Sequence, residues 1–139
     1  MIKIKKIDHV AVAVKDVDEA LATYKKIFGL EVASREAVAS QKTEAALLPL
    51  GEASIELIAP MEGNVGVQTF LEKRGPGLHH IAIEVEGIDE ALATLDKLGV
   101  PLIDKAARPG ARGHKVAFLH PKATGGVLVE LVEPAEHHG

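Results

Sequence analysis

The 139-residue sequence predicts an α+β fold built from two tandem βαβββ modules. The hexapeptide DEALAT occurs at residues 18–23 and again at residues 89–94, an offset of 71 residues. The segments that flank the two hexapeptides also match in the same order, which indicates a duplicated unit rather than chance similarity between two Ala-rich helices. Each copy also contains one alternating strand-like run, one amphipathic helix and three short strand-like runs.

The first module can be followed element by element. Residues 4–14 alternate apolar and polar side chains and are rich in Val and Ile, as expected for a strand with one buried face. Asp16 and Glu19 form a capping box that begins a helix, and Gly29 ends it. Three strands should follow at residues 30–39, 43–50 and 53–59, with residues 51 and 52 as a tight turn.

The second module repeats this order. We expect a strand at residues 78–86, a helix at 89–98, and strands at 100–105, 115–119 and 127–132. The chain is predicted to be one domain, with module one at 1–60, a linker at 61–75, module two at 76–134 and a tail at 135–139. The linker should contain a short helix at residues 65–73, and the tail with His137 and His138 should be disordered.

Composition excludes several classes of protein. A net charge of −4 argues against a general nucleic-acid binder, which would neutralise phosphates. No apolar run approaches the roughly 20 residues that span a bilayer, and the first residues already follow a strand pattern, so we expect no membrane association and a cytoplasmic location. The absence of cysteine excludes disulfides, thiolate metal sites and a cysteine nucleophile, so any metal must have nitrogen and oxygen ligands.

Four polar residues occupy matching strand positions in the two modules. His9 matches His80 at the offset of 71, and Glu56 matches Glu130 at an offset of 74. Taken singly, a buried His is more often part of the core, and a strand Glu more often faces solvent. A duplicated sheet would bring the first and last strands of each module together, so that the four groups could surround one divalent cation such as Co, Mn, Ni, Zn or Mg.

The paired modules with these four residues resemble the vicinal oxygen chelate superfamily, which includes glyoxalase I, ring-cleaving dioxygenases and bleomycin-resistance proteins. The resemblance covers nearly the whole chain. Within the superfamily, the segments IDHVAVAV, GLHHIAIEV and FLHPKATGGVLVELVEP are most similar to the methylmalonyl-CoA epimerase family. The resemblance implies a U-shaped eight-stranded mixed sheet around a divalent metal, with Co²⁺ first among the candidates. It also implies interconversion of the C2 epimers of a CoA thioester, and a homodimer.

The resemblance assigns roles to the glutamates. It makes Glu130 a metal ligand and one catalytic base. Some family members have a second Glu on the third strand, but a match without gaps through Gln41 places that position at Ala45, next to Glu44. Because neighbours in a strand face opposite sides, Glu44 takes this role only if a bulge shifts the register. Otherwise water or another group supplies the second proton.

A basic segment completes the candidate site. Residues 105–122 contain no acid and five basic side chains, which are Lys105, Arg108, Arg112, Lys115 and Lys122. Since coenzyme A is an anion, the loop at residues 110–113 either contacts its phosphates or the substrate carboxylate, or is simply a solvated loop. We assign Gln41, Arg112, Lys122 and His120 to substrate binding.

Two other functions remain open at this point. Another metal-dependent member of the superfamily, of the glyoxalase or dioxygenase type, would keep the metal ligands and change the substrate pocket. The FLHPK and GGVLVEL segments favour the epimerase over this alternative. A non-catalytic binding protein of the resistance type usually lacks the ligands, so His9, His80 and Glu130 count against it.

Overall fold

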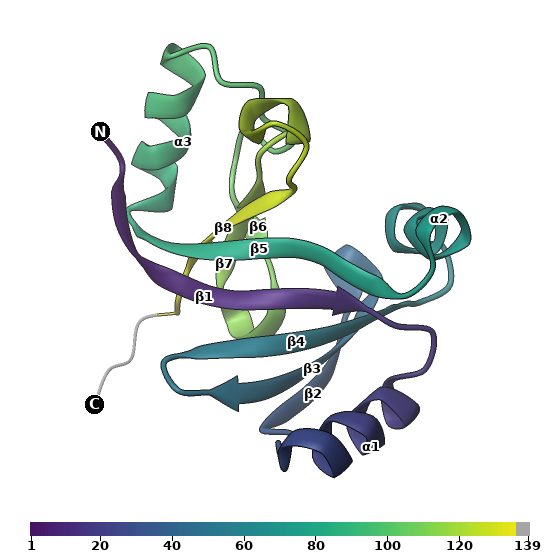
Figure 1. Ribbon diagram of the computed structural model, residues 1–139. Helices are drawn as coiled ribbons and strands as arrows, with labels where there is room; N and C mark the ends of the chain where they lie inside the picture. The colour runs from purple at the N-terminus through teal and green to yellow at the C-terminus, as the bar shows by residue number, and fades with distance from the viewer. Residues whose placement is uncertain (136–139) are drawn as a thin grey trace. The chain divides into compact units, whose positions relative to one another are not determined.

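The computed structural model describes residues 1–135 (Figure 1). The predicted tail with His137 and His138 falls largely outside the described residues. Eight strands form one mixed sheet in the order β2-β3-β4-β1-β5-β8-β7-β6. The order of elements along the chain is βαβββ, a helix, and βαβββ again, so the predicted α+β class with two modules is confirmed. None of the described helices is both long enough and apolar enough to cross a membrane.

Contacts divide the chain into two compact units, one of which is His9–His79. In this unit β1 (Lys3–Ala13) pairs in parallel with β4 (Ala53–Pro60). The antiparallel neighbour of β4 is β3 (Thr43–Leu50), which in turn pairs with β2 (Ser34–Val38). A turn of 3₁₀ helix, η1 (Ala39–Gln41), joins β2 to β3.

Helix α1 (Val17–Phe28) begins and ends where the sequence predicts. The Asp16 carboxylate accepts a hydrogen bond from the Glu19 N–H at 3.0 Å, and Gly29 adopts a left-handed conformation with φ of 70° that closes the last turn. The apolar side of α1 packs on one face of the sheet. Its buried contacts form a cluster of Val14, Val17, Ala46, Leu48, Leu57 and Ala59.

Helix α2 (Val65–Arg74) is the helix predicted within the linker. Asn64 caps it by accepting a hydrogen bond from the Val67 N–H at 2.8 Å. The same side chain donates to the backbone oxygens of Gln41 and Lys42, at 3.2 and 3.0 Å. Asn64 therefore both begins the helix and attaches it to the start of β3.

Among the described residues, the second unit consists of Met1–Asp8 and residues 80–135. It contains most of β5 (Gly77–Glu86), then α3 (Ile88–Lys97), β6 (Arg108–Pro109), β7 (Lys115–Phe118) and β8 (Val129–Glu133). Strand β5 pairs in parallel with β8, and the pairs of β8 with β7 and of β7 with β6 are antiparallel. Turns of 3₁₀ helix lie at η2 (Ala111–Gly113) and η3 (Pro121–Thr124).

The amino end of α3 has an unusual cap. Gly87 has no side chain to accept hydrogen bonds, and the carboxylate of Glu133 on β8 accepts from the Gly87 N–H at 2.8 Å instead. The helix packs its apolar side against β5, β7 and β8. The buried cluster consists of Val85, Ile88, Ala91, Leu92, Ala117, Leu119 and Leu131.

Two predicted strands require correction. The strand predicted at residues 100–105 is wrong, because only a single bridge joins Leu102 to Leu119 there. The N–H groups of Ile103 and Asp104 both donate to one carbonyl, that of Phe118, and Pro101 has no N–H, so a regular ladder cannot form. The first strand after the helix of this module is β6 instead.

The strand predicted at residues 30–39 is shorter in the structure, where it spans Ser34–Val38. Residues 30–33 carry the chain from the end of α1 back to the edge of the sheet, and only the Ala33 N–H among them bonds to β3, at Leu47. The 3₁₀ turn and Lys42, with a φ of 51°, then end the strand.

Candidate metal centre

One histidine–glutamate pair lies in the His9–His79 unit. In the pairing of β1 with β4, His9 is opposite Ser54 and Ala11 is opposite Glu56. His9 and Glu56 are therefore on the same face of the sheet, and they are offset by two residues along the strand direction. The His9 Nε2 atom is 3.6 Å from the Glu56 Oε1 atom. Only 4% and 9% of the two side chains are exposed. The other face of these strands carries Leu57 and Ala59, which pack beneath α1.

The second unit contains the same arrangement. Glu130 on β8 is in register with Ala82 on β5, again two residues along from the histidine, His80. The His80 Nε2 atom is 3.5 Å from the Glu130 Oε1 atom, and each side chain is 5% exposed. The repeat in the sequence therefore corresponds to a repeat in the structure. Each unit has one buried imidazole and one buried carboxylate on the same sheet face.

The distances within the pairs fit ligands of a metal better than hydrogen bonds. A nitrogen–oxygen hydrogen bond is usually about 2.7 to 3.2 Å long. Two adjacent ligands at about 2.1 Å from one ion are roughly 3.0 to 3.4 Å apart, which is close to the separations in both pairs. His9, Glu56 and His80 each offer a ligand atom, and these atoms all lie within 4.8 Å of one another. Buried carboxylates need a compensating positive charge, so this group of residues could hold a divalent cation.

Glu44 lies on the opposite face of the sheet from Glu56. Register pairs Glu44 with Ala59 and Ala45 with Ile58, so Ala45 shares the face of Glu56 and Glu44 shares the face covered by α1. The β3–β4 register is continuous from Thr43 to Leu50 and contains no bulge. The residue of β3 that lies on the face of Glu56 at this position is therefore Ala45, which has only a methyl group and no carboxylate.

The Glu44 carboxylate is engaged in an ion-pair network. Arg35 donates from Nε to the Glu44 Oε1 atom at 2.7 Å and from Nη1 to the Asp18 Oδ1 atom at 2.5 Å. This hydrogen bond and the positive charge of Arg35 lower the pKa of Asp18 below its usual value. The hydrogen bonds to the two carboxylates also raise the pKa of Arg35. Glu44 thus helps to fasten β2 and β3 to α1.

We expect the substitution Glu44→Gln to leave catalytic activity within about threefold of the wild-type rate, against the roughly 10² to 10⁴-fold loss typical for a general base. The physical reason is that its carboxylate is paired with Arg35 on the helix-covered face. Steady-state rates with purified protein test this. A loss comparable to that of a base would show that β3 changes register when substrate binds.

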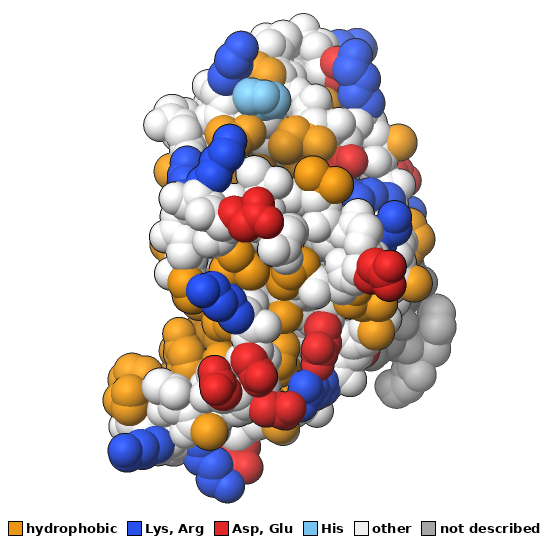
Figure 2. Space-filling model, turned by 90° about the vertical axis from the view of Figure 1, so that its right-hand side faces the viewer, with side chains coloured by type: hydrophobic (Ala, Val, Ile, Leu, Met, Phe, Trp, Pro, Cys, Tyr) orange, Lys and Arg blue, Asp and Glu red, His pale blue; other side chains and the backbone are white. Residues whose placement is uncertain are grey.

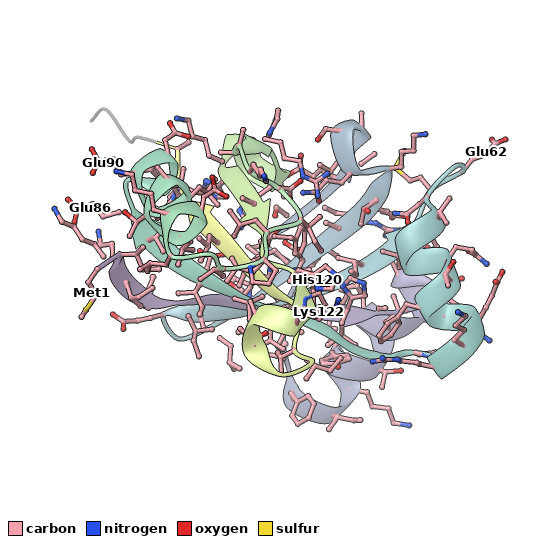
Figure 3. The ribbon with its side chains drawn as sticks, turned by 90° about the horizontal axis from the view of Figure 1, so that it is seen from above. Met1, Glu62, Glu86, Glu90, His120 and Lys122 are labelled. Atoms are coloured by element: carbon pink, nitrogen blue, oxygen red, sulfur yellow. The ribbon has the colours of Figure 1, made fainter. Side chains whose placement is uncertain are left out.

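The residues assigned to substrate binding lie in several places. Arg112 is in the loop of η2 with a φ of 58°, donates from Nε to His114 Nε2 at 3.2 Å and approaches Asp8 at 3.7 Å. His120 and Lys122 are close together at η3 (Figure 3), where the His120 Nδ1 atom accepts from the Lys122 N–H at 3.1 Å. Gln41 is half-buried at the end of η1 in the other unit.

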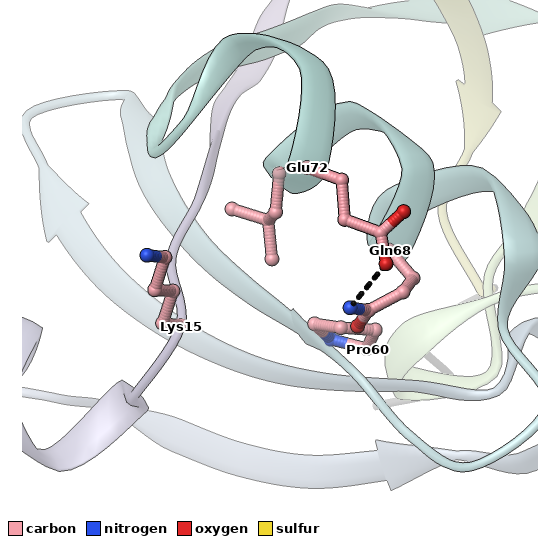
Figure 4. Close-up of a pocket in the computed structure, with 5 residues that line it drawn as sticks. Lys15, Pro60, Gln68 and Glu72 are labelled. Carbon is pink, nitrogen blue, oxygen red and sulfur yellow. Dashed lines mark hydrogen bonds between the residues drawn. The ribbon is translucent and has the colours of Figure 1, made fainter.

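The His9–His79 unit also contains a surface hollow between α2 and the ends of β1 and β4 (Figure 4). Its lining consists of Lys15, Pro60, Gln68, Leu71 and Glu72. Gln68 donates to the Glu72 carboxylate at 3.2 Å across the rim. Strand alternation puts Pro60 on the same sheet face as Glu56. The lining has one cation, one carboxylate and no histidine, so this hollow lacks the ligands of a metal centre.

Sequence reasoning did not assign a role to Phe118. Its ring packs edge-on against the His80 imidazole, with 5.1 Å between the ring centroids, and Phe118 is in register with Glu130. The FLHPK segment contains this residue, but its orientation depends on how β7 and β8 pair. Phe118 therefore restricts the position of the His80 ring and covers one side of the pair.

Comparison with known proteins agrees with this fold. A sequence profile of the glyoxalase/bleomycin resistance protein/dioxygenase superfamily matches residues 8–118. The chain therefore belongs to this superfamily.

The chain is also similar to individual members of this superfamily. The chain is 42% identical over 129 residues to the uncharacterised protein YqjC of Bacillus subtilis, covering 93% of this chain and 92% of that protein. It is 38% identical over 127 residues to the mitochondrial methylmalonyl-CoA epimerase of Homo sapiens, covering 91% of this chain and 72% of that protein. A solved structure of methylmalonyl-CoA epimerase from Mycobacterium tuberculosis superposes with a TM-score of 0.91 at 38% identity, covering 96% of this chain and 90% of that one.

Proposed function

We propose that this protein is an isomerase that interconverts (2R)- and (2S)-methylmalonyl-CoA with the help of a bound divalent cation. Two observations support this proposal. Each unit contains a buried His–Glu pair with the same two-residue stagger. The chain is also 38% identical, over 91% of its length, to the methylmalonyl-CoA epimerase of Homo sapiens. The substrate class, a CoA thioester, comes from those relatives.

The proposed ligands of the cation are His9, Glu56, His80 and Glu130. Two imidazoles and two carboxylates suit borderline and hard divalent ions, and we propose Co²⁺, with Mn²⁺, Ni²⁺, Zn²⁺ or Mg²⁺ as alternatives. When bound, such an ion supplies a Lewis acid that stabilises the negative charge developing on the thioester oxygen. The burial of all four side chains supports the proposal, because a dry site strengthens this stabilisation.

The protein groups must move one proton. We propose that the Glu130 carboxylate removes the C2 proton, so that the C2–H bond breaks and its electron pair moves toward the thioester carbonyl. Return of a proton to the opposite face of C2 gives the other epimer. Glu44 could provide that proton only with a change of register, because Ala45 occupies its place on the face of Glu56. We therefore propose water or another group as the second acid.

We also propose that the protein is a single domain with the module limits 1–60, 61–75, 76–134 and 135–139, and that it acts as a homodimer in the cytoplasm. A chain without cysteine agrees with a reducing compartment. Ile27, Phe28 and Val32 are 63%, 64% and 45% exposed, and together they offer an apolar surface that a second subunit could cover.

The test uses metal-loaded protein and one pure epimer of methylmalonyl-CoA. We expect the epimer to convert to the same equilibrium mixture that the other epimer gives. Parallel assays use the hemithioacetal of methylglyoxal and glutathione, and a catechol, which are substrates of the glyoxalase and dioxygenase types. Turnover of either of these with no epimerisation would contradict the proposal.

A further inference from the structure

A cation lies close to the His80–Glu130 pair, on the same sheet face. Arg108 on β6 is in register with Val116 on β7, and alternation along β7 puts Val116 and Phe118 on one face. The Arg108 guanidinium lies over the Phe118 ring at 5.7 Å from its centroid, which is within the range of a cation–π contact. The Phe118 ring in turn packs on His80. One aromatic ring thus separates the guanidinium from a proposed metal ligand.

Asp104 holds Arg108 in this position. Its Oδ2 atom accepts a hydrogen bond from the Phe118 N–H at 2.8 Å and is 3.4 Å from the Arg108 Nε atom. Within residues 1–135, Asp104 is the acidic residue that pairs with Arg108, and this contact uses Nε. The Arg108 side chain is 37% exposed, and the Asp104 contact leaves the two terminal amino groups of the guanidinium as donors for a ligand.

The loop beside Arg108 is closely packed. A Cβ atom on Gly110 would come within 2.7 Å of the Val116 side chain, so only glycine allows this approach of β6 to β7. Elsewhere on the surface, Lys and Arg side chains are interspersed with acidic and apolar ones on the face shown in Figure 2. Arg108 is a single cation that Asp104 and the Phe118 ring hold in place.

We infer that Arg108 is a specificity-determining residue that binds the free carboxylate of the acyl group, an inference that rests on the proposed function. Arginine presents a planar set of donors that matches a carboxylate or a phosphate. The free carboxylate is bonded directly to C2, the carbon next to Glu130 in the proposed reaction, whereas the phosphates of CoA lie at the far end of the pantetheine arm. The short path from His80 through Phe118 to Arg108 favours the carboxylate.

The experiment measures binding of three ligands to the metal-loaded protein by calorimetry. Malonyl-CoA has the free carboxylate, propionyl-CoA lacks it, and CoA has only the phosphates. We expect Arg108→Gln to weaken the binding of malonyl-CoA about 10- to 100-fold, as for a lost hydrogen bond to a charged group. The affinities for propionyl-CoA and CoA should change by less than about twofold. Arg108→Lys should restore part of the affinity for malonyl-CoA because it keeps the charge.

The chain provides a matched control in the other unit. Arg74 lies over the Phe70 ring at 5.6 Å, and Phe70 packs on His79, with 4.9 Å between the ring centroids. His79 faces away from His80 by strand alternation. Arg74→Gln removes the same kind of contact and should lower the thermal stability about as much as Arg108→Gln does. It should leave the affinity for malonyl-CoA unchanged.

Two results would overturn the inference. Equal weakening of all three ligands by Arg108→Gln would mean that Arg108 binds phosphate, and unchanged affinity for malonyl-CoA would mean that it binds neither group. Epimerisation by the wild-type protein is measured first. An inactive wild type counts against the proposed function, whereas an active wild type with no carboxylate selectivity counts against Arg108 alone.

Discussion

The Glu130→Gln variant should keep its metal and lose epimerisation by about 10² to 10⁴-fold, the usual effect of removing a general base. The amide preserves the shape of the side chain and one oxygen ligand, but it cannot accept the C2 proton. Because only 5% of the Glu130 side chain is exposed, bulk water has little access to substitute for the carboxylate. Metal content and the rate of epimerisation, measured on the same preparation, test both parts of this expectation.

Glu133→Gln is the matched control for this variant. Glu133 lies on the same strand but on the other sheet face, where its carboxylate accepts from the Gly87 N–H and caps α3. Its substitution should lower the free energy of unfolding by about 0.3 to 1 kcal/mol, because the amide oxygen can still accept a hydrogen bond but the negative charge at the helix amino end is lost, with little effect on the rate of epimerisation. If Glu130→Gln lost its metal along with activity, Glu130 would be a ligand only, and another residue would have to be the base.

The His80→Ala variant should lose both metal and activity. Removal of an imidazole from the proposed ligand set should lower the affinity for the metal. The loss should be well over the roughly 10- to 100-fold that follows removal of a residue that only hydrogen-bonds to a ligand. Without the ion, the charge that develops on the thioester oxygen has no Lewis acid to stabilise it. Equilibrium dialysis against Co²⁺, followed by metal analysis, gives the stoichiometry directly.

His79→Ala is the control, because His79 is next to His80 in the sequence but packs on Phe70, whereas His80 packs on Phe118. It should bind one ion per chain and retain activity. Full metal occupancy in His80→Ala would contradict the proposed ligand set. Normal activity in metal-free wild-type protein would contradict the role of the metal altogether.

Much of the candidate site could be predicted because strands have a period of two residues. The offsets of 71 residues between His9 and His80 and of 74 residues between Glu56 and Glu130 predict that these four residues form one site. The same alternation indicated that Glu44 faces away from them, which agrees with the continuous β3–β4 register. Capping residues gave both ends of α1 for a similarly local reason, since Asp16 and Gly29 act within a single helical turn.

The features that sequence reasoning missed depend on pairing between distant segments. Residues 100–105 have a strand-like composition, but the shared Phe118 carbonyl and Pro101 prevent a ladder, so β6 forms later in the chain. The contact of Arg108 with Phe118 depends on which residues of β6 and β7 are opposite each other. A count of basic residues in this segment gives no means of distinguishing Arg108 from Arg112.

The most direct test of the central claim is the exchange of the C2 proton of methylmalonyl-CoA in deuterated water. Protein freed of metal by a chelator and protein reloaded with Co²⁺ or Mn²⁺ are incubated with a single epimer, and deuterium at C2 is followed by mass spectrometry. We expect rapid incorporation with the reloaded wild type, and only background incorporation with metal-free protein and with Glu130→Gln. Incorporation at the same rate with and without metal, or none with reloaded wild-type protein, would contradict metal-assisted proton abstraction at this site.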